Sequence, residues 1–284
     1  MADGARIRVA YQGERGAFSE DAARKLLVSE IETIPNRTFE EMFESVSSGA
    51  ARCAVVPIEN SLAGSVHKNY DLLIAHDLTI IGETNIRIVH NLIAPRRVPL
   101  SAIRRVYSHP VALAQCERFL RANPHMEVAP AYDTAGGVKM VVENNRGDEA
   151  AIAGATAAKV YGASIVAKAI EDNAKNFTRF LLLARADDAG AVTLAAAGRA
   201  RKTTIVFRVA NRPGALFRSL AAFALRDIDL AKIESRPIEG RPWEYSFYLD
   251  LIGDRREPHV ERAVAHLAEM AESIRVLGSY STKG

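Results

Sequence analysis

The chain has 284 residues, which is enough for two domains of ordinary size, one about twice as large as the other. Hydrophobic residues make up 48% and charged residues 25%, as in soluble globular proteins, and no apolar run reaches the roughly 20 residues that span a bilayer. The net charge of +3 comes from 37 basic and 34 acidic residues without a basic block, which argues against nucleic acid as a partner.

The N-terminal segment MADGARIRVAYQG leads almost directly into a strand-like run, without the apolar core of a signal peptide. We therefore expect a cytoplasmic protein. Cys53 and Cys116 are the only cysteines, one beside an apolar strand and one within a helical pattern, which suggests neither a metal site nor a disulfide. We expect both thiols to be reduced and structural.

Strand-like runs alternate with helical patterns up to residue 186, which is typical of α/β layers. The strand-like runs are IRVAYQG, CAVVPIEN, IRRVYSH, AAIAG and RFLLLAR, and the helical ones include EDAARKLLV, FEEMFESVSSG and PVALAQCERFL. Thr38 with Glu41 predicts a capping box and Pro110 suits a first helical position. Asp133 or Thr134 can cap the helix that begins AGGVKMVVE.

The segment 187–202 is rich in Ala and Gly and predicts a linker between residues 1–186 and residues 203–284. The second region has the βαββαβ order of ferredoxin-like domains. Its strand WEYSFYLDLI alternates, with one face formed by Trp243, Tyr245, Phe247 and Leu249 and the other by Glu244, Ser246, Tyr248 and Asp250. We expect one face to be covered and the more polar face, or an edge, to be able to meet a second copy.

Small polar residues follow the apolar run CAVVP closely, namely Glu59, Asn60, Ser61, Gly64 and Ser65. Backbone N–H groups at a loop-to-helix transition, supplemented by amide and hydroxyl donors, can bind an anion. An N-cap with a tight turn is the alternative interpretation. The density of small polar residues favours a binding site.

Three further junctions between a strand and a helix carry polar residues. YQGERGAFSE resembles the first design but lacks the GxGxxG spacing of nucleotide sites. YSHPVALAQC places His109 at a strand end and Gln115 in the following helix, and we favour a capping or orienting role for this histidine over acid–base catalysis. YDTAGG places Thr134 at a third junction, where capping is again an alternative to binding.

The segment NFTRF, residues 176–180, opens directly into the apolar run LLLA. In a strand, Thr178 and Arg179 point to opposite faces, and Thr178 shares its face with Asn176 and Phe180. One of the two therefore faces a cleft and the other a support, unless an irregular pleat brings both to the cleft.

The charge of Arg179 also needs a partner if the side chain is buried. An unpaired buried guanidinium is very costly. The partner is then either an anionic ligand or an internal carboxylate such as Glu59 or Asp172.

The motifs YQGERGAFSE, VPIENSLAGSV, YSHPVALAQC, YDTAGG, AAIAGATAAKVYG and NFTRF, in this order, resemble prephenate dehydratase, including plant-type relatives that act on arogenate. NRPGALFRSLAAFALRDIDLAKIESRP and IRVLGSY resemble the ACT regulatory domain of that family. The resemblance covers nearly the whole chain except residues 1–6 and the linker. Because no helical chorismate mutase segment precedes IRVAYQG, it is closest to the monofunctional dehydratase.

This resemblance implies a catalytic domain of two α/β lobes, like a periplasmic binding protein, with the site in the cleft and an ACT domain after it. It implies a lyase that converts prephenate to phenylpyruvate by decarboxylation and dehydration in L-phenylalanine biosynthesis. No metal or organic cofactor is expected, because the departing hydroxyl accepts the electrons and the ring becomes aromatic. The enzyme must donate to that hydroxyl and hold the carboxylates without over-stabilising the one that is lost.

The resemblance also implies roles for individual residues. Thr178 corresponds to the family's catalytic threonine, and Arg179 is expected to be catalytic as well, as a contact to a carboxylate or the pyruvyl group of the substrate. Whether Thr178 is the proton source or an orienting donor is open, because its pKa is too high for a free acid near neutral pH. The expected substrate-binding residues are Glu59, Asn60, Ser61, Gly64, His109, Gln115, Thr134, Asn176 and Phe180.

L-phenylalanine is expected to bind the ACT domain and to inhibit the enzyme. We expect the second strand of that domain beside the first, with IESRP running away from the turn NRPGAL, so that one chain would not bring both motifs to one ligand. A homodimer or a dimer of dimers would. The expected allosteric residues are Asn211, Pro213, Gly214, Ala215, Leu216, Glu234, Ser235, Arg236 and Pro237.

Two alternatives stay open at this point. Arogenate differs from prephenate only in an amino group in place of a keto group, so an arogenate dehydratase that forms L-phenylalanine directly has the same motifs. A small-molecule receptor with an ACT sensor would use the same lobes without chemistry, although Thr178 and Arg179 in the family order argue against it.

Overall fold

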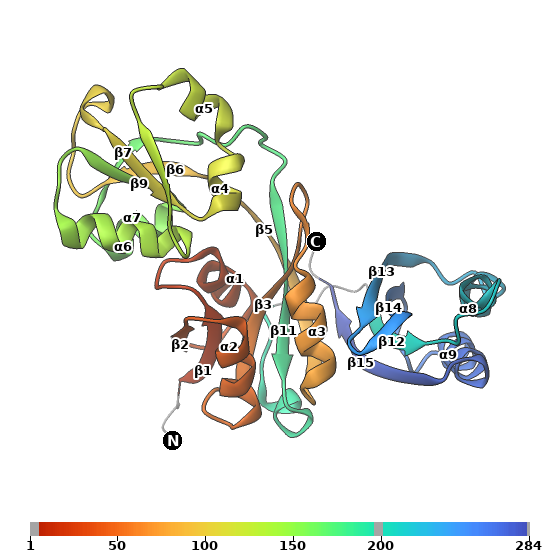
Figure 1. Ribbon diagram of the computed structural model, residues 1–284. Coiled ribbons are helices and arrows are strands. Elements are labelled where there is room, and N and C mark those ends of the chain that lie inside the picture. The colour runs from red at the N-terminus through yellow and green to blue at the C-terminus, as the bar shows by residue number, and fades with distance from the viewer. Residues whose placement is uncertain (1–5, 196–200, 283–284) are drawn as a thin grey trace, which may run out of the picture.

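The computed structural model describes residues 6–195 and 201–282. Two α/β lobes are followed by a domain with an antiparallel sheet (Figure 1). The strands are β1 Ile7–Gln12, β2 Ile31–Asn36, β3 Cys53–Asn60, β4 Gly64–Ser65, β5 Thr79–Arg87, β6 Asn91–Ala94, β7 Arg105–Ser108, β8 Glu127–Pro130, β9 Glu149–Ala153, β10 Ser164–Ala167, β11 Phe177–Ala184, β12 Arg201–Arg208, β13 Leu230–Ile238, β14 Arg241–Ile252 and β15 Ser273–Ser281. The helices are α1 Phe18–Leu26, α2 Phe39–Ser47, α3 His67–Ala75, α4 Pro110–Ala114, α5 Glu117–Ala122, α6 Thr134–Asn144, α7 Ala155–Val160, α8 Ala215–Ala224 and α9 Pro258–Met270, with 3-10 turns η1 Leu100–Ala102 and η2 Ala186–Ala191.

The first lobe is built on a sheet with strand order β2-β1-β3-β11-β5, to which β4 adds beside β3. The second lobe has the order β10-β6-β9-β7-β8. The chain passes from the first lobe to the second between β5 and β6 and returns between β10 and β11 (Figure 1). The predicted α/β layers and the two lobes are confirmed, and the strand ends of β3 and β11 lie at the boundary between the lobes.

Most of the predicted helix starts are confirmed. The Glu41 N–H donates to the Thr38 hydroxyl at 3.1 Å, and Asp133, rather than Thr134, caps α6 by accepting from the Gly136 N–H at 2.8 Å. The pattern PVALAQCERFL forms two short helices, α4 and α5, instead of one. The Gln115 carbonyl accepts from the Asp172 N–H at 2.7 Å and so does not continue the helical ladder.

The predicted linker 187–202 lies partly outside the described residues. The first part of this segment, residues 187–195, is described by the structure and packs on the first lobe. Val192 is buried in the core of that lobe, Leu194 packs beside it, and the Ala195 N–H donates to the Leu26 carbonyl at 2.7 Å. These two apolar side chains supply the burial that a flexible linker lacks. The following strand β12 already begins at Arg201.

The C-terminal domain has the predicted βαββαβ order and the sheet order β13-β14-β12-β15. Helices α8 and α9 pack on one face of this sheet (Figure 1). The other face lies against the first lobe, where Tyr248 and Tyr280 belong to one core with residues of that lobe. The expectation that this polar face could meet a second copy is therefore wrong, because the first lobe covers it.

The position of the second strand in this domain differs from the expected one. Strand β14 lies between β12 and β13, and the register aligns Arg208 of β12, Ser246 of β14 and Arg236 of β13 in one row. Strands β12 and β13 therefore run in the same direction and finish at the same end of the sheet. The NRPG turn, which follows β12, and the ESRP segment of β13 lie near this end, on either side of β14, rather than running apart.

In the part of the chain that the structure describes, no helix combines the length and apolar character needed to cross a bilayer. Cys53 and Cys116 are buried and unpaired, and burial raises the pKa of both thiols to about 12. Such thiols are inert, which agrees with a structural role.

Candidate active site

A cavity of about 500 Å³ lies between the two lobes and is lined by both of them. Its volume is typical of small-molecule sites. The first lobe contributes the end of β3 and the starts of β11, α1 and α3, and the second lobe contributes the starts of α4 and α6. Of the residues predicted for the site, the cavity is lined by Asn60, Gly64, His109, Gln115, Thr134, Thr178 and Phe180.

Thr178 lies at the wall of this cavity, paired in register with Asn60 of the neighbouring strand. The Asn60 amide nitrogen donates to the Thr178 hydroxyl oxygen at 2.9 Å. The hydroxyl hydrogen has no acceptor among the described residues. Thr178 is therefore held as an acceptor from one side, while its own O–H is available to donate to a ligand.

The orientation of Asn60 is fixed by its surroundings. Its side-chain oxygen accepts from the backbone N–H groups of Leu62 and Ala63 at 3.0 and 2.9 Å, so its nitrogen must face Asn176 and Thr178. The side-chain oxygen of Asn176 accepts from Asn60 at 2.8 Å. The acceptor site on Thr178 is therefore filled by a donor that has only one possible orientation.

The same chain of amides continues into the second lobe. The Asn176 nitrogen donates to the Gln115 oxygen at 2.8 Å, and the Gln115 nitrogen donates to Asn60 at 3.3 Å. Nε2 of His90 lies 2.9 Å from the Gln115 oxygen and must carry the proton, because that oxygen only accepts. Burial lowers the pKa of His90, so its ring is neutral near pH 7.

The polar groups around the cavity are hydroxyls, amides, imidazoles and one carboxylate, that of Asp133. Asp133 caps α6, and Nδ1 of His109 caps α4 by accepting from the Val111 N–H at 3.3 Å. The capping role expected for His109 is thus observed. Helices α1 and α3 start at the cavity without a side-chain cap, at Ala17 and Val66, and their N–H groups are suited to an anion.

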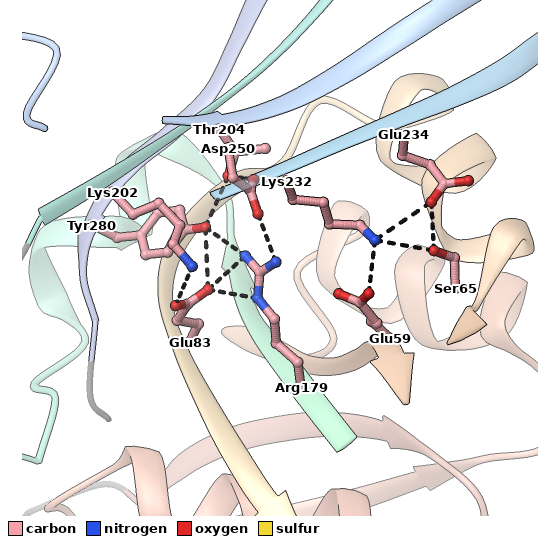
Figure 2. A network of polar contacts seen from close by, with 10 residues as sticks. All are labelled: Glu59, Ser65, Glu83, Arg179, Lys202, Thr204, Lys232, Glu234, Asp250 and Tyr280. Carbon is pink, nitrogen blue, oxygen red and sulfur yellow. Dashed lines mark hydrogen bonds and ion pairs between the residues drawn. The ribbon is translucent and has the colours of Figure 1, made fainter. Parts of the chain in front are cut away.

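Arg179 does not line the cavity, and the expectation that it contacts substrate is corrected. Its side chain points to the opposite face of β11, where it pairs with Glu83 at 2.6 Å and with Asp250 of the C-terminal domain at 2.6 Å (Figure 2). The strand alternation explains this, because Thr178 occupies the cleft face. The internal ion pair expected as the alternative exists, although its carboxylates are not Glu59 or Asp172.

Three other residues expected to bind substrate do not line the cavity either. Glu59 pairs with Lys232 of the C-terminal domain at 2.9 Å, because it lies on the same face of the sheet as Arg179. The Ser61 hydroxyl donates to the Lys175 carbonyl at 3.0 Å. Asn176 is fully buried and reaches the cavity only through Gln115 and Asn60.

Sequence reasoning did not name several residues of the cavity wall, among them Phe18, His90 and Tyr132. The Phe18 and His90 rings meet edge to face, with centroids 5.9 Å apart. His90 stands in the run IRIVHNLIA, where a His-Asn pair interrupts apolar residues. A polar pair inside such a run is a signal of a buried polar network that could have indicated it.

The residues expected for an allosteric site fall into two groups. Asn211, Ala215 and Leu216 line a cavity of about 110 Å³ together with Trp243, Tyr245 and Phe247 of β14. Pro213 and Gly214 belong to the adjoining turn but are not part of its lining. The second group lies on β13, where Glu234 contacts Ser65, Arg236 contacts Asp71, and Ser235 and Pro237 follow the same strand.

Comparison with known proteins agrees with this architecture. The sequence profile of the family Prephenate dehydratase matches residues 9–188, and that of the ACT domain matches residues 203–269. Arogenate dehydratase/prephenate dehydratase 2 of Arabidopsis thaliana, a chloroplastic protein, is 45% identical over 289 residues, which cover 99% of this chain and 74% of that protein.

Two solved structures share the whole fold. Prephenate dehydratase from Arthrobacter aurescens, in complex with L-Phe, has a TM-score of 0.86 and 32% identity, and the match covers 97% of this chain and 90% of that one. GqqA, described as a novel type of quorum quenching acylase, has a TM-score of 0.85 and 34% identity, with 97% and 98% coverage. With the family profiles and the relatives in agreement, this chain belongs to the prephenate dehydratase family and carries a C-terminal ACT domain.

Proposed function

We propose that the protein converts prephenate to phenylpyruvate in the cleft between the two lobes, with Thr178 as the donor to the departing hydroxyl. The family makes the protein a carbon–oxygen lyase of phenylalanine biosynthesis. The observation that carries the role of Thr178 is its hydrogen bond from Asn60, which leaves the threonine O–H free to donate to a ligand in the cavity.

The reaction needs a donor where negative charge develops. As the ring loses CO₂, the electrons of that bond restore aromaticity and the C4 hydroxyl departs. A hydrogen bond from Thr178 that strengthens on the departing oxygen lowers the barrier. Asn60 orients Thr178 for this step, and Gln115 and Asn176 hold Asn60 in place.

Neutral donors suit the substrate carboxylates. A guanidinium would form charge-assisted bonds, which are about twice as strong as neutral ones and would favour the ground-state carboxylate that has to leave. The uncapped starts of α1 and α3 and the amide of Gln115 supply weaker, fixed donors. The ring of Phe180 gives the product ring an apolar wall.

Arogenate is the second candidate substrate. Asp133 places a carboxylate at the cavity, which would attract the ammonium group that distinguishes arogenate from prephenate. The relative from Arabidopsis thaliana is named for both activities.

Incubation of the purified protein with prephenate and, separately, with arogenate tests this function. Product identification by mass spectrometry should find phenylpyruvate from prephenate, and L-phenylalanine if arogenate is also used. Absence of product from both substrates, in protein shown to be folded by circular dichroism, would leave the receptor alternative.

We further propose feedback inhibition by L-phenylalanine at the ACT domain of a homodimer. The cavity beside Leu216 and Trp243 holds about 110 Å³, well below the roughly 300 Å³ at which small-molecule sites begin, so a second copy would have to complete it. Phe217, Leu225 and Trp243 are each more than three-quarters exposed, and such residues suit a subunit contact. Sedimentation and calorimetric titration with L-phenylalanine measure both parts; a monomer that binds no phenylalanine would contradict them.

A further inference from the structure

Two neighbouring strands of the first lobe serve the active site with one face and the ACT domain with the other. Thr178 and Asn60 are paired across β11 and β3 and both line the cavity. The next pair in the same register is Arg179 and Glu59, and both of these side chains contact the ACT domain. The catalytic pair and the interdomain pair are therefore adjacent along the same two strands.

Arg179 is held by a buried cluster that spans both domains (Figure 2). Its Nη1 lies 2.6 Å from Asp250 of β14, its Nη2 lies 2.6 Å from Glu83 of β5, and Nη2 also donates to the Tyr280 hydroxyl of β15 at 3.2 Å. Lys202 pairs with the second oxygen of Glu83 at 2.7 Å. Because the two cations face two carboxylates, the charges in this cluster balance.

The cluster is shielded from water, and this restricts how far its side chains can move relative to one another. The side chain of Arg179 is 14% exposed, and those of Glu83 and Asp250 are 7% exposed. Burial alone would lower the pKa of Arg179, but Asp250 and its neighbours raise it above its ordinary value, so the guanidinium stays charged. In a dry environment a guanidinium that bridges two carboxylates accepts little displacement from either of them.

The backbone beside Arg179 is irregular, which gives side-chain anchors more influence there. The register of β11 against β3 shifts between Arg179 and Phe180. A bulge locally interrupts the ladder of hydrogen bonds and redirects the side chains around it. The direction of Thr178, immediately before Arg179, is thus set partly by what holds Arg179.

We propose that Arg179 is a positioning residue for Thr178 and that the ACT domain, through Asp250, completes the active-site geometry of the dehydratase. The proposal rests on the proposed function. Asp250 touches Arg179 on the face of β11 opposite to the cavity, so its influence on catalysis has to pass through that strand. Thr204 and Tyr280 help to hold Asp250 in place, because the Thr204 hydroxyl donates to Asp250 at 2.6 Å and lies 2.8 Å from the Tyr280 hydroxyl.

The first test replaces groups of the ACT domain only. Asp250→Asn removes the charge that Arg179 pairs with, and Tyr280→Phe removes one acceptor while keeping the ring. We expect kcat for prephenate to fall by about tenfold or more in Asp250→Asn, with KM within about twofold, because a displaced catalytic donor costs rate rather than binding. Tyr280→Phe should show a smaller fall in the same direction.

Asp71→Asn is the matched control. It breaks another ion pair between the first lobe and the ACT domain, that of Asp71 with Arg236 at 2.9 Å, but Asp71 lies on α3 and does not line the cavity. Its kcat should stay at the wild-type value. An equal fall in kcat for Asp71→Asn and Asp250→Asn would mean that loosened docking in general is responsible, which overturns the proposal.

The decisive measurement combines Asp250→Asn with Thr178→Ala. If Arg179 acts through Thr178, Asp250→Asn should lower kcat by less than about twofold once the threonine hydroxyl is absent. A full tenfold fall in both backgrounds would show independent effects and refute the proposal, as would unchanged kcat in both ACT variants. Wild-type protein inactive on prephenate and arogenate would instead overturn the proposed function on which the inference rests.

Discussion

Gly278 lies where the ACT domain packs tightly against the first lobe, and it gives a direct test of their docking. A Cβ atom on this residue would lie 2.1 Å from the Ile80 carbonyl oxygen of β5 and 2.9 Å from the Ile80 carbonyl carbon and Cβ, whereas ordinary contacts lie at 3.4–4 Å. Since the closest of these atoms is backbone, a side-chain rotation cannot relieve the clash. In Gly278→Ala, β15 must move away from β5.

The expected cost follows from overpacking, which destabilises by about 1–3 kcal/mol. For a chain of this size, roughly 2–4 °C of melting temperature correspond to each kcal/mol, so differential scanning calorimetry should find the Tm of Gly278→Ala lower by about 2–12 °C. Gly190→Ala is the control, since a Cβ there meets nothing within 4 Å. If the Tm of Gly278→Ala equalled that of the wild-type protein, the tight contact between β15 and β5 would be refuted.

Further predictions concern single side chains. Thr178→Ala should lower kcat on the order of 10²-fold with little change in KM in steady-state assays, and near-normal kinetics would exclude its role. Cys53 and Cys116 should react with a thiol reagent only after unfolding, because burial raises the pKa of both to about 12; fast labelling of native protein would contradict this. The contribution of neutral His90 to the free energy of unfolding should be complete above about pH 6.5 and should decrease as the pH falls below that value. The reason is that burial lowers the pKa of His90 in the folded protein, so the unfolded chain binds the proton more readily. Urea titrations should show a smaller decrease in His90→Gln, and an equal one would rule out His90 as the cause.

Local patterns were sufficient for the elements and for the geometry within one strand. Alternation along NFTRF placed Thr178 and Arg179 on opposite faces, and the structure has them so. The same alternation could not tell which face meets the cleft. That depends on the docking of the ACT domain, whose Asp250 is 71 residues away in sequence.

Partners distant in sequence account for most of the corrections. The carboxylates expected near Arg179 were Glu59 and Asp172, both close to the motifs, whereas the structure uses Glu83 and Asp250. Glu59 pairs with Lys232 instead. Charge complementarity predicts that a buried guanidinium finds a carboxylate, but only tertiary packing decides which one.

The pleat of a strand offers a physical reason why the TRF segment combines a hydroxyl, a guanidinium and an aromatic ring. Successive side chains alternate, so Thr178 and Phe180 line the cavity while Arg179 between them reaches the ACT domain. A lysine at position 179 could keep the charge but not the paired contacts to Glu83 and Asp250, which need the planar fork. The arginine is thus suited to bridging two domains rather than to holding a substrate carboxylate, and the side chains that can donate hydrogen bonds in the cavity are neutral ones.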